Sequence, residues 1–224
     1  MAHPVRKAVT VHDEREAALY AHGHVFVIDD DNAVRFAITA IFVHAGYAVS
    51  EFSSAEAFLE FEQRNEPLFP GPKCLLLDVK MPASSGLELQ HRLAAIETEL
   101  PIVFMSGGSS ATEAVQAMKA GALDFLIKPF DDDELLSVVG RALAKSVADE
   151  AASLSTQEAK RRYAWLSSRE AQIARMVSKG LQNLQIAGEL GIAERTVKLH
   201  RMHMMRKLGA TNVIELIRIL DKLS

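Results

Sequence analysis

The stretch Cys74-Leu75-Leu76-Leu77-Asp78-Val79-Lys80-Met81-Pro82 decides the fold, because an apolar run leads directly into one carboxylate. A run this short and apolar is typical of a strand buried in a parallel sheet. Similar runs that lead into polar residues occur at Val25–Ile28, Ile102–Met105 and Phe125–Ile127. The carboxyl ends of parallel strands meet at one edge of the sheet, where ligand sites form. The sequence therefore predicts a polar site at that edge.

Helix-like segments alternate with these strands. Apolar residues recur at helical spacing in four segments, which are Asn32–Ala45, Ser54–Arg64, Gly86–Ile96 and Ser110–Ala120. Tyr47–Phe52 alternates like a further strand, and Asp124–Ile127 reads as the last one. Alternation of this kind predicts βαβ units and a parallel sheet. A fifth helical pattern follows Pro129, and five strand–helix pairs fit a flavodoxin-like, doubly wound α/β domain with a five-stranded parallel sheet.

The charge of the chain is divided between its two ends. The net charge is −4 over 224 residues. Residues 161–224 contain 12 Lys and Arg against 5 Asp and Glu, a net charge of +7, which leaves −11 for the remainder. An acidic front and a basic tail suggest two domains with different partners, and the basic one is a candidate for binding nucleic acid.

Several protein classes are excluded by composition. Cys74 is the single cysteine, so neither a disulfide framework nor a cysteine-based zinc site is expected. No apolar run approaches the roughly 20 residues that span a bilayer, and Met1–Thr10 lacks the apolar core of a signal peptide. We therefore expect a cytoplasmic protein with no membrane partner.

The polar residues at the predicted sheet edge suggest phosphoryl chemistry. Asp29 and Asp30 follow the first strand, and together with Asp78 and the backbone carbonyl of Lys80 they supply the oxygen ligands that Mg²⁺ (or Mn²⁺) prefers. An ionised aspartate beside such a cation can act as a nucleophile toward phosphorus. Two further groups, the Ser106 hydroxyl and the Lys128 ammonium group, can bind phosphoryl oxygens.

Each of these residues also has an ordinary structural explanation. An aspartate after a strand is commonly a loop residue or a helix cap, Ser106 can be a turn residue before Gly107, and Lys128 can be a solvated cation. Four strand ends with suitable polar groups in the right order favour the site over these separate explanations.

The motifs together resemble a bacterial two-component receiver domain. They are Asp29-Asp30, Asp78 with Met81-Pro82, Ser106-Gly107, Gly121-Ala122-Leu123-Asp124-Phe125 and Lys128-Pro129-Phe130. The resemblance covers about Val25 to Leu143. It implies that Asp78 accepts phosphate from a histidine kinase, that Ser106 and Phe125 form a switch, and that the region around Ser110–Ile127 is a dimerisation face.

The basic tail reads as a helix-turn-helix. Gln182–Leu190 and Glu194–Leu208 are helical in pattern and are joined through Gly191, and the second helix is a candidate reader of the DNA major groove. Helical spacing predicts that one face of the second helix packs against the rest of the domain. Its residues are Val197, His200, Arg201, Met204 and Leu208. The candidates for DNA contact are Lys179, Arg195, Thr196, Lys198, Leu199, Arg201, Met202 and Lys207. Lys198 is suited to guanine, Leu199 and Met202 to thymine methyl groups, and the arginines with Lys179 and Lys207 to phosphates.

Simple solvation of a charged helix face is the alternative explanation for this surface. The segment from about Tyr163 to Leu223 nevertheless resembles the LuxR-type helix-turn-helix of FixJ/NarL-type response regulators, most closely FixJ and the styrene-catabolism regulators. The matching motifs are Leu166-Ser167-x-Arg169-Glu170, Gly180-Leu181-x-Asn183, Ile186-Ala187, Leu190-Gly191-Ile192, Arg195-Thr196-Val197-Lys198-x-His200 and Arg206-Lys207-Leu208-Gly209. In that family the last helix pairs two DNA-binding domains.

Two positions depart from this family pattern. Leu184 stands where a lysine is usual, which removes a phosphate contact. Ala193 stands where serine or threonine caps the recognition helix, and loss of such a cap costs about 1 kcal/mol.

The resemblances imply a response regulator and not a conventional enzyme, although receivers support their own phosphotransfer and dephosphorylation. We expect an N-terminal extension at 1–22, a receiver at 23–143, a helical linker at 144–162 and a DNA-binding domain at 163–224. Phosphorylation would promote a homodimer that binds promoter DNA and acts with RNA polymerase, with activation as the expected direction. Two alternatives are a phosphorylation-independent DNA-binding protein whose receiver is a dimerisation scaffold, and a protein-interaction module without DNA.

Overall fold

The computed structural model describes residues 22–63, 71–82, 84–96, 98, 100–108 and 111–223. It divides into two compact units, residues 1–149 and 150–224. The predicted extension at 1–22 lies outside the described residues except for His22, as do Arg64 and Ser110 at the ends of two predicted helices.

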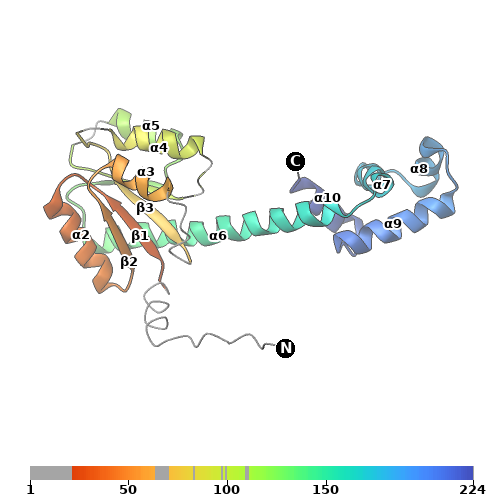
Figure 1. Ribbon diagram of the computed structural model, residues 1–224, viewed down its shortest axis with the longest axis horizontal. Coiled ribbons are helices and arrows are strands. Elements are labelled where there is room, and N and C mark those ends of the chain that lie inside the picture. Colours follow the sequence, from red (N-terminus) through yellow and green to blue (C-terminus); the bar gives the residue numbers. More distant parts are fainter. Residues whose placement is uncertain are drawn as a thin grey trace, which may run out of the picture. The chain divides into compact units, whose positions relative to one another are not determined.

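A five-stranded parallel sheet forms the centre of the first unit (Figure 1). Its strands are β1 (His24–Ile28), β2 (Ala48–Phe52), β3 (Lys73–Asp78), β4 (Ile102–Ser106) and β5 (Asp124–Ile127). The order β2-β1-β3-β4-β5 is that of the flavodoxin-like fold, so the predicted fold class is confirmed. The predicted strand ends differ from the observed ones by no more than one residue.

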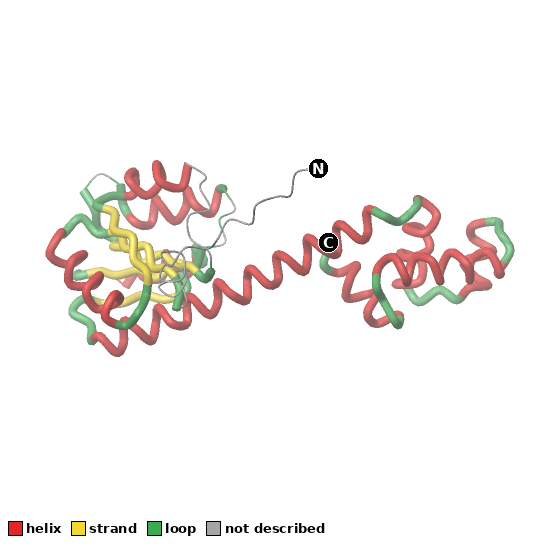
Figure 2. The backbone as a smooth tube through the Cα atoms, turned by 60° about the horizontal axis from the view of Figure 1, so that its bottom comes forward, coloured by secondary structure: helices red, strands yellow, loops and turns green. Residues whose placement is uncertain are grey.

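Helices cover both faces of this sheet, as Figure 2 shows in red on either side of the yellow strands. They are α2 (Asn32–His44), α3 (Ala55–Gln63), α4 (Gly86–Ala95), α5 (Ala111–Lys119) and α6 (Asp132–Ala164). One core contains Phe42 of α2 and Leu135 of α6, while the other contains Phe58 of α3, Leu89 of α4 and Ala117 of α5. Strands buried on both faces explain why their sequences are almost continuously apolar.

Side-chain caps and one glycine place the helices around the sheet edge. The Ser54 hydroxyl accepts a hydrogen bond from the Ala57 amide at 3.2 Å and so caps the first turn of α3. Asp31 caps α2, and Ser85 caps α4. A Cβ at Gly86 would overlap the backbone carbonyl of Asp78, so only glycine lets α4 begin this close to the end of β3.

Helix α6 is continuous from Asp132 to Ala164. Its first turn contains Asp132, Asp133 and Glu134, which the positive end of the helix dipole favours. The segment 144–162, predicted as a helical linker, is helical, and no helix end marks either of its predicted boundaries. Neither α6 nor any other helix in the described ranges combines the length and the apolar character that crossing a bilayer requires.

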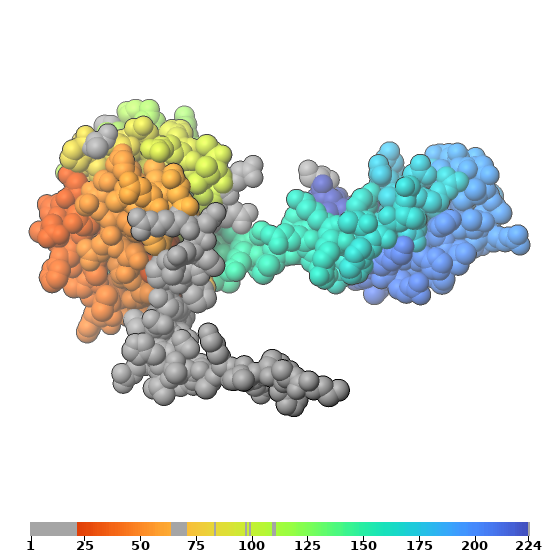
Figure 3. All heavy atoms as spheres, in the orientation of Figure 1, coloured from red at the N-terminus to blue at the C-terminus, as the bar shows by residue number. Residues whose placement is uncertain are grey.

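The second unit is helical. After the end of α6 come α7 (Ser168–Ser178), α8 (Asn183–Leu190), α9 (Glu194–Leu208) and α10 (Val213–Asp221). The end of α6 and these helices pack together in Figure 3, around a core that includes Ile173, Ile186, Val197, Met204 and Leu216. Ser167 and Glu170 form a capping box at the start of α7.

Candidate functional sites

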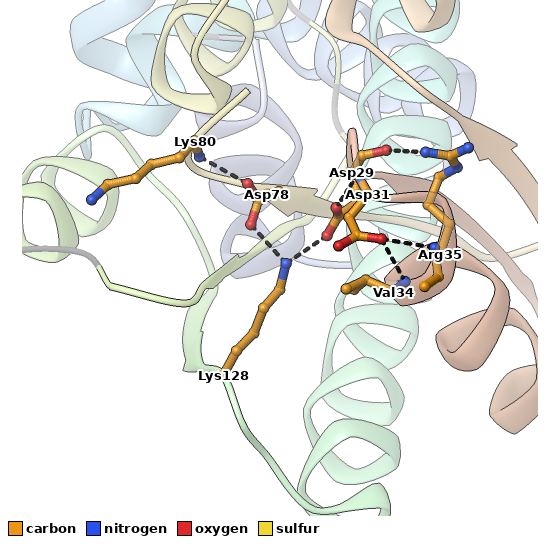
Figure 4. A network of polar contacts seen from close by, with 8 residues as sticks. Asp29, Asp31, Val34, Arg35, Asp78, Lys80 and Lys128 are labelled. Carbon is orange, nitrogen blue, oxygen red and sulfur yellow. Dashed lines mark hydrogen bonds and ion pairs between the residues drawn. The ribbon is translucent and has the colours of Figure 1, made fainter. Parts of the chain in front are cut away.

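Strand topology brings Asp29 and Asp78 to the same edge of the sheet. β1 and β3 are neighbours, with Ile28 opposite Leu77. Asp29 and Asp78 follow these two residues in the sequence and therefore lie side by side. The strand order reverses direction between these two strands, and such a switch point is the usual ligand-binding position in an open α/β sheet. Lys128 reaches the same place from the loop after β5 (Figure 4).

Lys128 joins the two carboxylates. Its Nζ lies 2.5 Å from Asp29 Oδ2 and 2.9 Å from Asp78 Oδ1. The Asp29 and Asp78 side chains are only 2% and 7% exposed. Their other oxygens accept backbone hydrogen bonds, Asp29 Oδ1 from the Asp31 amide and Asp78 Oδ2 from the Lys80 amide. The carboxylates are therefore fixed in orientation and held largely out of water.

Burial and charge act in opposite directions at this site. Burial raises the pKa of Asp78 above its usual range, although the hydrogen bond and charge of Lys128 oppose the shift, and the nearby Asp29 carboxylate adds to it. Burial would lower the pKa of Lys128, but its hydrogen bonds to Asp29 and Asp78 outweigh this effect and leave that pKa raised. Two acidic groups thus share one cation, and the site is deficient in positive charge.

Sequence reasoning missed Arg35, which holds the backbone at Asp29. Its Nη1 donates a hydrogen bond of 2.6 Å to the backbone carbonyl of Asp29 (Figure 4). Arg35 Nε also lies 3.8 Å from Glu51 on β2. The sequence offers only a helical position six residues beyond Asp29 as a signal, because the contact depends on how α2 packs beside β1.

Ser106 and Phe125 occupy adjacent strands near the acidic site. Ser106 ends β4 and is buried, and its carbonyl accepts the amide of Lys128 at 2.8 Å. Phe125 is half-buried on β5, with its ring centroid 6.2 Å from that of Phe104. Ser106 pairs with Ile127 across the two strands, so it lies at the level from which Lys128 departs. Ser106 therefore lies one residue beyond Met105, the partner of Asp78 on β4, whereas Phe125 lies lower on β5 against Phe104.

The donor set suits a hard cation. Asp29 and Asp78 are two buried carboxylates with only one lysine between them, and oxygen ligands are those that Mg²⁺ prefers. Asp30 is exposed beside them. Within the described ranges no three His, Cys, Asp or Glu side chains are grouped as a metal site, and the assignment of Asp29, Asp30 and Asp78 as ligands stays a prediction. Binding of Mg²⁺ at the phosphorylation site is typical of receiver domains.

The second candidate site is the exposed face of α9. The prediction that Val197, Met204 and Leu208 face the core is confirmed, because all three are fully buried. His200 and Arg201, predicted on the same face, are half-buried. Arg195 and Lys198 are exposed, and Leu199 and Met202 expose 49% and 56% of their surface. Among the remaining predicted contacts, Lys179 is exposed and Thr196 half-buried. The face combines cations with uncovered apolar groups.

Three basic residues on α9 are already engaged, which sequence reasoning did not foresee. Lys207 was expected to lie free for a phosphate, but its Nζ is 2.7 Å from Glu170 Oε2. Arg201 Nη1 donates to Asn183 Oδ1 at 3.0 Å, and Lys198 Nζ lies 2.9 Å from Glu194. The local pair at 194 and 198 could have been read from its helical spacing, whereas the Glu170–Lys207 pair joins residues far apart in the sequence.

The departures from the family pattern appear in the structure. The N-cap residue of α9 is Ala193, which makes no side-chain hydrogen bond to the helix. Leu184, in the first turn of α8, is 71% exposed. The first turn of α9 therefore depends on its packing and on Glu194 for stability, since acid in a first turn is favourable.

Comparisons with known proteins agree with both sites. The family model "Response regulator receiver domain" matches residues 25–140, and "Bacterial regulatory proteins, luxR family" matches residues 164–220. The response regulator protein TodT of Pseudomonas putida is 39% identical over 199 residues, which cover 89% of this chain and 86% of TodT. The transcriptional regulatory protein FixJ of Bradyrhizobium diazoefficiens is 37% identical over 199 residues, covering 88% and 94%.

A solved structure is similar over nearly the same length. The response regulator StyR is 39% identical, with a TM-score of 0.72 and coverage of 89% of this chain and 98% of StyR. The chain therefore belongs to the response regulators in which a receiver domain is followed by a LuxR-type DNA-binding domain, and it is homologous to the transcriptional regulators TodT and FixJ.

Proposed function

We propose that Asp78 is the phosphoryl acceptor of this regulator and that its phosphorylation by a sensor histidine kinase in the cytoplasm controls promoter binding. The position of Lys128 between two buried carboxylates is the observation that carries this proposal. Such an arrangement is costly to bury and contributes little to stability by itself. Two fixed carboxylates with one lysine at a sheet switch point are suited to a divalent cation, which would offset the negative charge of an incoming phosphoryl group.

The carboxylate of Asp78 supplies the nucleophile. One of its oxygens replaces the histidine nitrogen on phosphorus, so the phosphorus–nitrogen bond breaks as an acyl phosphate forms. The Lys80 amide holds Asp78 Oδ2 in place. Lys128, already within 2.9 Å of Asp78, is positioned to neutralise a phosphoryl oxygen, and the Ser106 hydroxyl is the proposed donor to another. Autodephosphorylation by water would use the same groups.

We assign the cation site to Asp29, Asp30, Asp78 and the Lys80 carbonyl, with Mg²⁺ or Mn²⁺ as the ion. When bound, the ion would neutralise charge on the transferring phosphoryl group. Asp29 and Asp78 contribute fixed, buried oxygens, and Asp30 is the exposed member of the set.

Phosphorylation is proposed to act through Ser106 and Phe125 on a dimerisation face. Ser106 would move toward the phosphoryl group, and the half-buried Phe125 would turn inward. The face around residues 110–127 carries uncovered apolar side chains that support this proposal, namely Val115, Met118 and Ile127, which are 51%, 46% and 71% exposed. Apolar groups gathered on one surface are typical of a protein interface.

Promoter DNA is the proposed ligand of α9. Arg195, Lys198, Leu199 and Met202 are exposed and suited to the major groove, and Lys179, Thr196, Arg201 and Lys207 are proposed as supporting contacts. In a dimer the second recognition helix gains from effective concentration, so modest dimer affinity produces a larger gain in DNA affinity. Recruitment of RNA polymerase, and hence activation, is the proposed consequence.

Light scattering of the full chain with Mg²⁺, with and without the phosphoryl donor acetyl phosphate, tests this function. We expect a donor-dependent rise from monomer to dimer in the wild type and in Asp149→Asn, a control on α6 that removes an acid paired with Lys145, outside both the acidic site and the proposed face. Asp78→Asn should show neither the rise nor phosphate incorporation. If Asp78→Asn still dimerised with the donor or activated a promoter, the receiver would be a phosphorylation-independent scaffold instead.

A further inference from the structure

The last turn of α6 contacts the end of the recognition helix. Arg162 Nη1 donates a hydrogen bond of 3.1 Å to the backbone carbonyl of Leu208, the final residue of α9. Arg162 Nε is held by Glu158 Oε1 at 2.7 Å, one turn earlier on α6. The guanidinium is thus oriented by its own helix and directed at another.

This contact satisfies a chemical need of α9. The last carbonyls of a helix have no partner within the helix, and the negative end of the helix dipole lies there. A guanidinium at that position both donates the missing hydrogen bond and neutralises the partial charge. Arg162 is therefore a C-terminal cap for α9 that comes from a different helix.

Gly209 makes the approach of Arg162 possible. It follows Leu208 with a φ of +72°, a left-handed conformation that favours glycine. A Cβ at this position would overlap Arg162 Nη1. The glycine thus has two reasons to be present, the backbone turn and the space that the guanidinium occupies.

The neighbouring Arg161 provides a matched comparison. It pairs with the same Glu158 at 2.8 Å, and its guanidinium lies 5.6 Å from the centre of the Trp165 ring. In the part of the chain that the structure describes, no hydrogen bond joins Arg161 to α9. The two arginines therefore share a helix, a charge and an acidic partner, but only Arg162 holds the recognition helix.

We propose that Arg162 is a positioning residue for DNA reading: it fixes the C-terminal end of α9 to α6, the helix through which the chain leaves the receiver. This inference rests on the proposed function of α9 in binding promoter DNA. A recognition helix must be held in one orientation for several side chains to meet base edges together, whereas phosphate contacts tolerate displacement. Loss of Arg162 should consequently reduce specific binding more than non-specific binding.

Fluorescence anisotropy with the phosphorylated full chain tests this difference. The probes are a duplex selected from random DNA by the wild type and a scrambled duplex. We expect Arg162→Gln to bind the selected duplex about fivefold more weakly than Arg161→Gln, which is about 1 kcal/mol, and both to bind the scrambled duplex equally. Arg162→Lys should recover part of the loss, because an ammonium group can still donate to the carbonyl. Equal binding of the selected duplex by Arg162→Gln and Arg161→Gln would overturn the proposal.

Amide hydrogen exchange supplies a readout that needs no DNA. The amides of Gly209 and Ala210 donate to the last turn of α9, and they should exchange faster in Arg162→Gln but not in Arg161→Gln. If the wild type selects no duplex, the proposed DNA-binding function fails, and the exchange measurement still decides the role of Arg162. Unchanged exchange at 209 and 210 would overturn the positioning role directly.

A double-mutant cycle with Gly209→Ala separates the two roles of the glycine. If Gly209 is needed to admit Arg162, then Arg162→Gln and Gly209→Ala should cost less together than the sum of their separate losses in affinity for the selected duplex. Strict additivity would show that Gly209 serves the backbone turn alone and that the close approach of Arg162 is unimportant.

Discussion

Two pairs of buried carboxylate and lysine, one in each unit, behave in opposite ways. In the receiver, Asp29 and Asp78 share Lys128, and burial raises the pKa of Asp78. In the DNA-binding unit, burial also acts to raise the pKa of Glu170, but the hydrogen bond from Lys207 and two from Ser167 outweigh it and lower that pKa to about 2. The same residue types therefore form a site short of positive charge in the receiver, and a carboxylate with all its hydrogen-bond and charge partners in the DNA-binding unit.

The difference lies in how many partners each carboxylate has. Glu170 receives the amide of Ser167 and Lys207 on the same oxygen, and it closes a capping box. No second acid shares its lysine in the described structure. Asp78 must share its lysine with Asp29, which leaves a requirement for positive charge. A saturated pair is a structural device, whereas an unsaturated pair is suited to ligand chemistry.

Removing Lys128 should have the largest effect on stability. Lys128→Met leaves two buried carboxylates without a counter-charge, and we expect the receiver unit to lose about 3 kcal/mol at neutral pH. The loss is measured by amide hydrogen exchange in β3 as a function of denaturant concentration, in magnesium-free buffer. The control is Lys145→Met, which breaks an exposed pair with Asp149. A loss no larger than that of the control would mean that water already stabilises the two acids.

Removing Lys207 should cost less. Lys207→Met leaves Glu170 its hydrogen bonds with Ser167, so we expect a loss of about 2 kcal/mol from the second unit. Trp165 is the single tryptophan of the chain and belongs to this unit, so its fluorescence reports unfolding there. The matched change Lys198→Met, at an exposed pair, should have little effect. A larger loss for Lys207→Met than for Lys128→Met would reverse the comparison.

A fall in pH should change the contributions of Glu170 and Asp78 to folding stability in opposite directions. The pKa of Glu170 is lowered on folding from 4.5 to about 2, so its contribution is complete above pH 4.5 and is lost as pH falls toward 2. The raised pKa of Asp78 means that protonation there relieves an unfavourable charge. Trp165 fluorescence during acid titration should therefore show less pH dependence in Glu170→Gln than in the wild type, while amide exchange in β3 should show no such change. Parallel curves for Glu170→Gln and the wild type would contradict the assignment.

His24 gives the receiver an acid sensitivity of its own. Burial, with a smaller contribution from Lys73, lowers the pKa of His24 from 6.5 to about 4. Because the unfolded chain binds this proton more readily, the receiver should lose stability as pH falls from 6.5 to 4. His24→Gln should reduce the pH dependence of amide exchange in β1 over this range. The same change at the exposed His44 should not. Unchanged pH dependence in His24→Gln would assign the sensitivity to other groups.

The smallest expected change is a gain. Ala193→Ser would supply the N-cap that α9 lacks and should stabilise the second unit by about 1 kcal/mol. Trp165 fluorescence during denaturant unfolding measures the gain, and Ala193→Val is the control because valine cannot cap. If serine gave no more stability than valine, the first turn of α9 would already be satisfied by its packing.

Local patterns in the sequence determined the elements and their order. Apolar runs marked the strands, helical spacing marked the helices, and alternation predicted the doubly wound sheet. These signals work because strand burial, helix periodicity and capping depend on neighbouring residues. The sequence also placed Asp29, Asp78 and Lys128 at strand ends, and their roles in phosphoryl transfer remain predictions.

Tertiary structure decided which charged groups meet. Nothing near Glu170 in the sequence indicates Lys207, and nothing near Arg162 indicates the carbonyl of Leu208. These partners are brought together by helix packing, which sequence spacing does not encode. The number of partners then sets the balance of charge, which is why Glu170 is matched by Lys207 while Asp29 and Asp78 share one lysine.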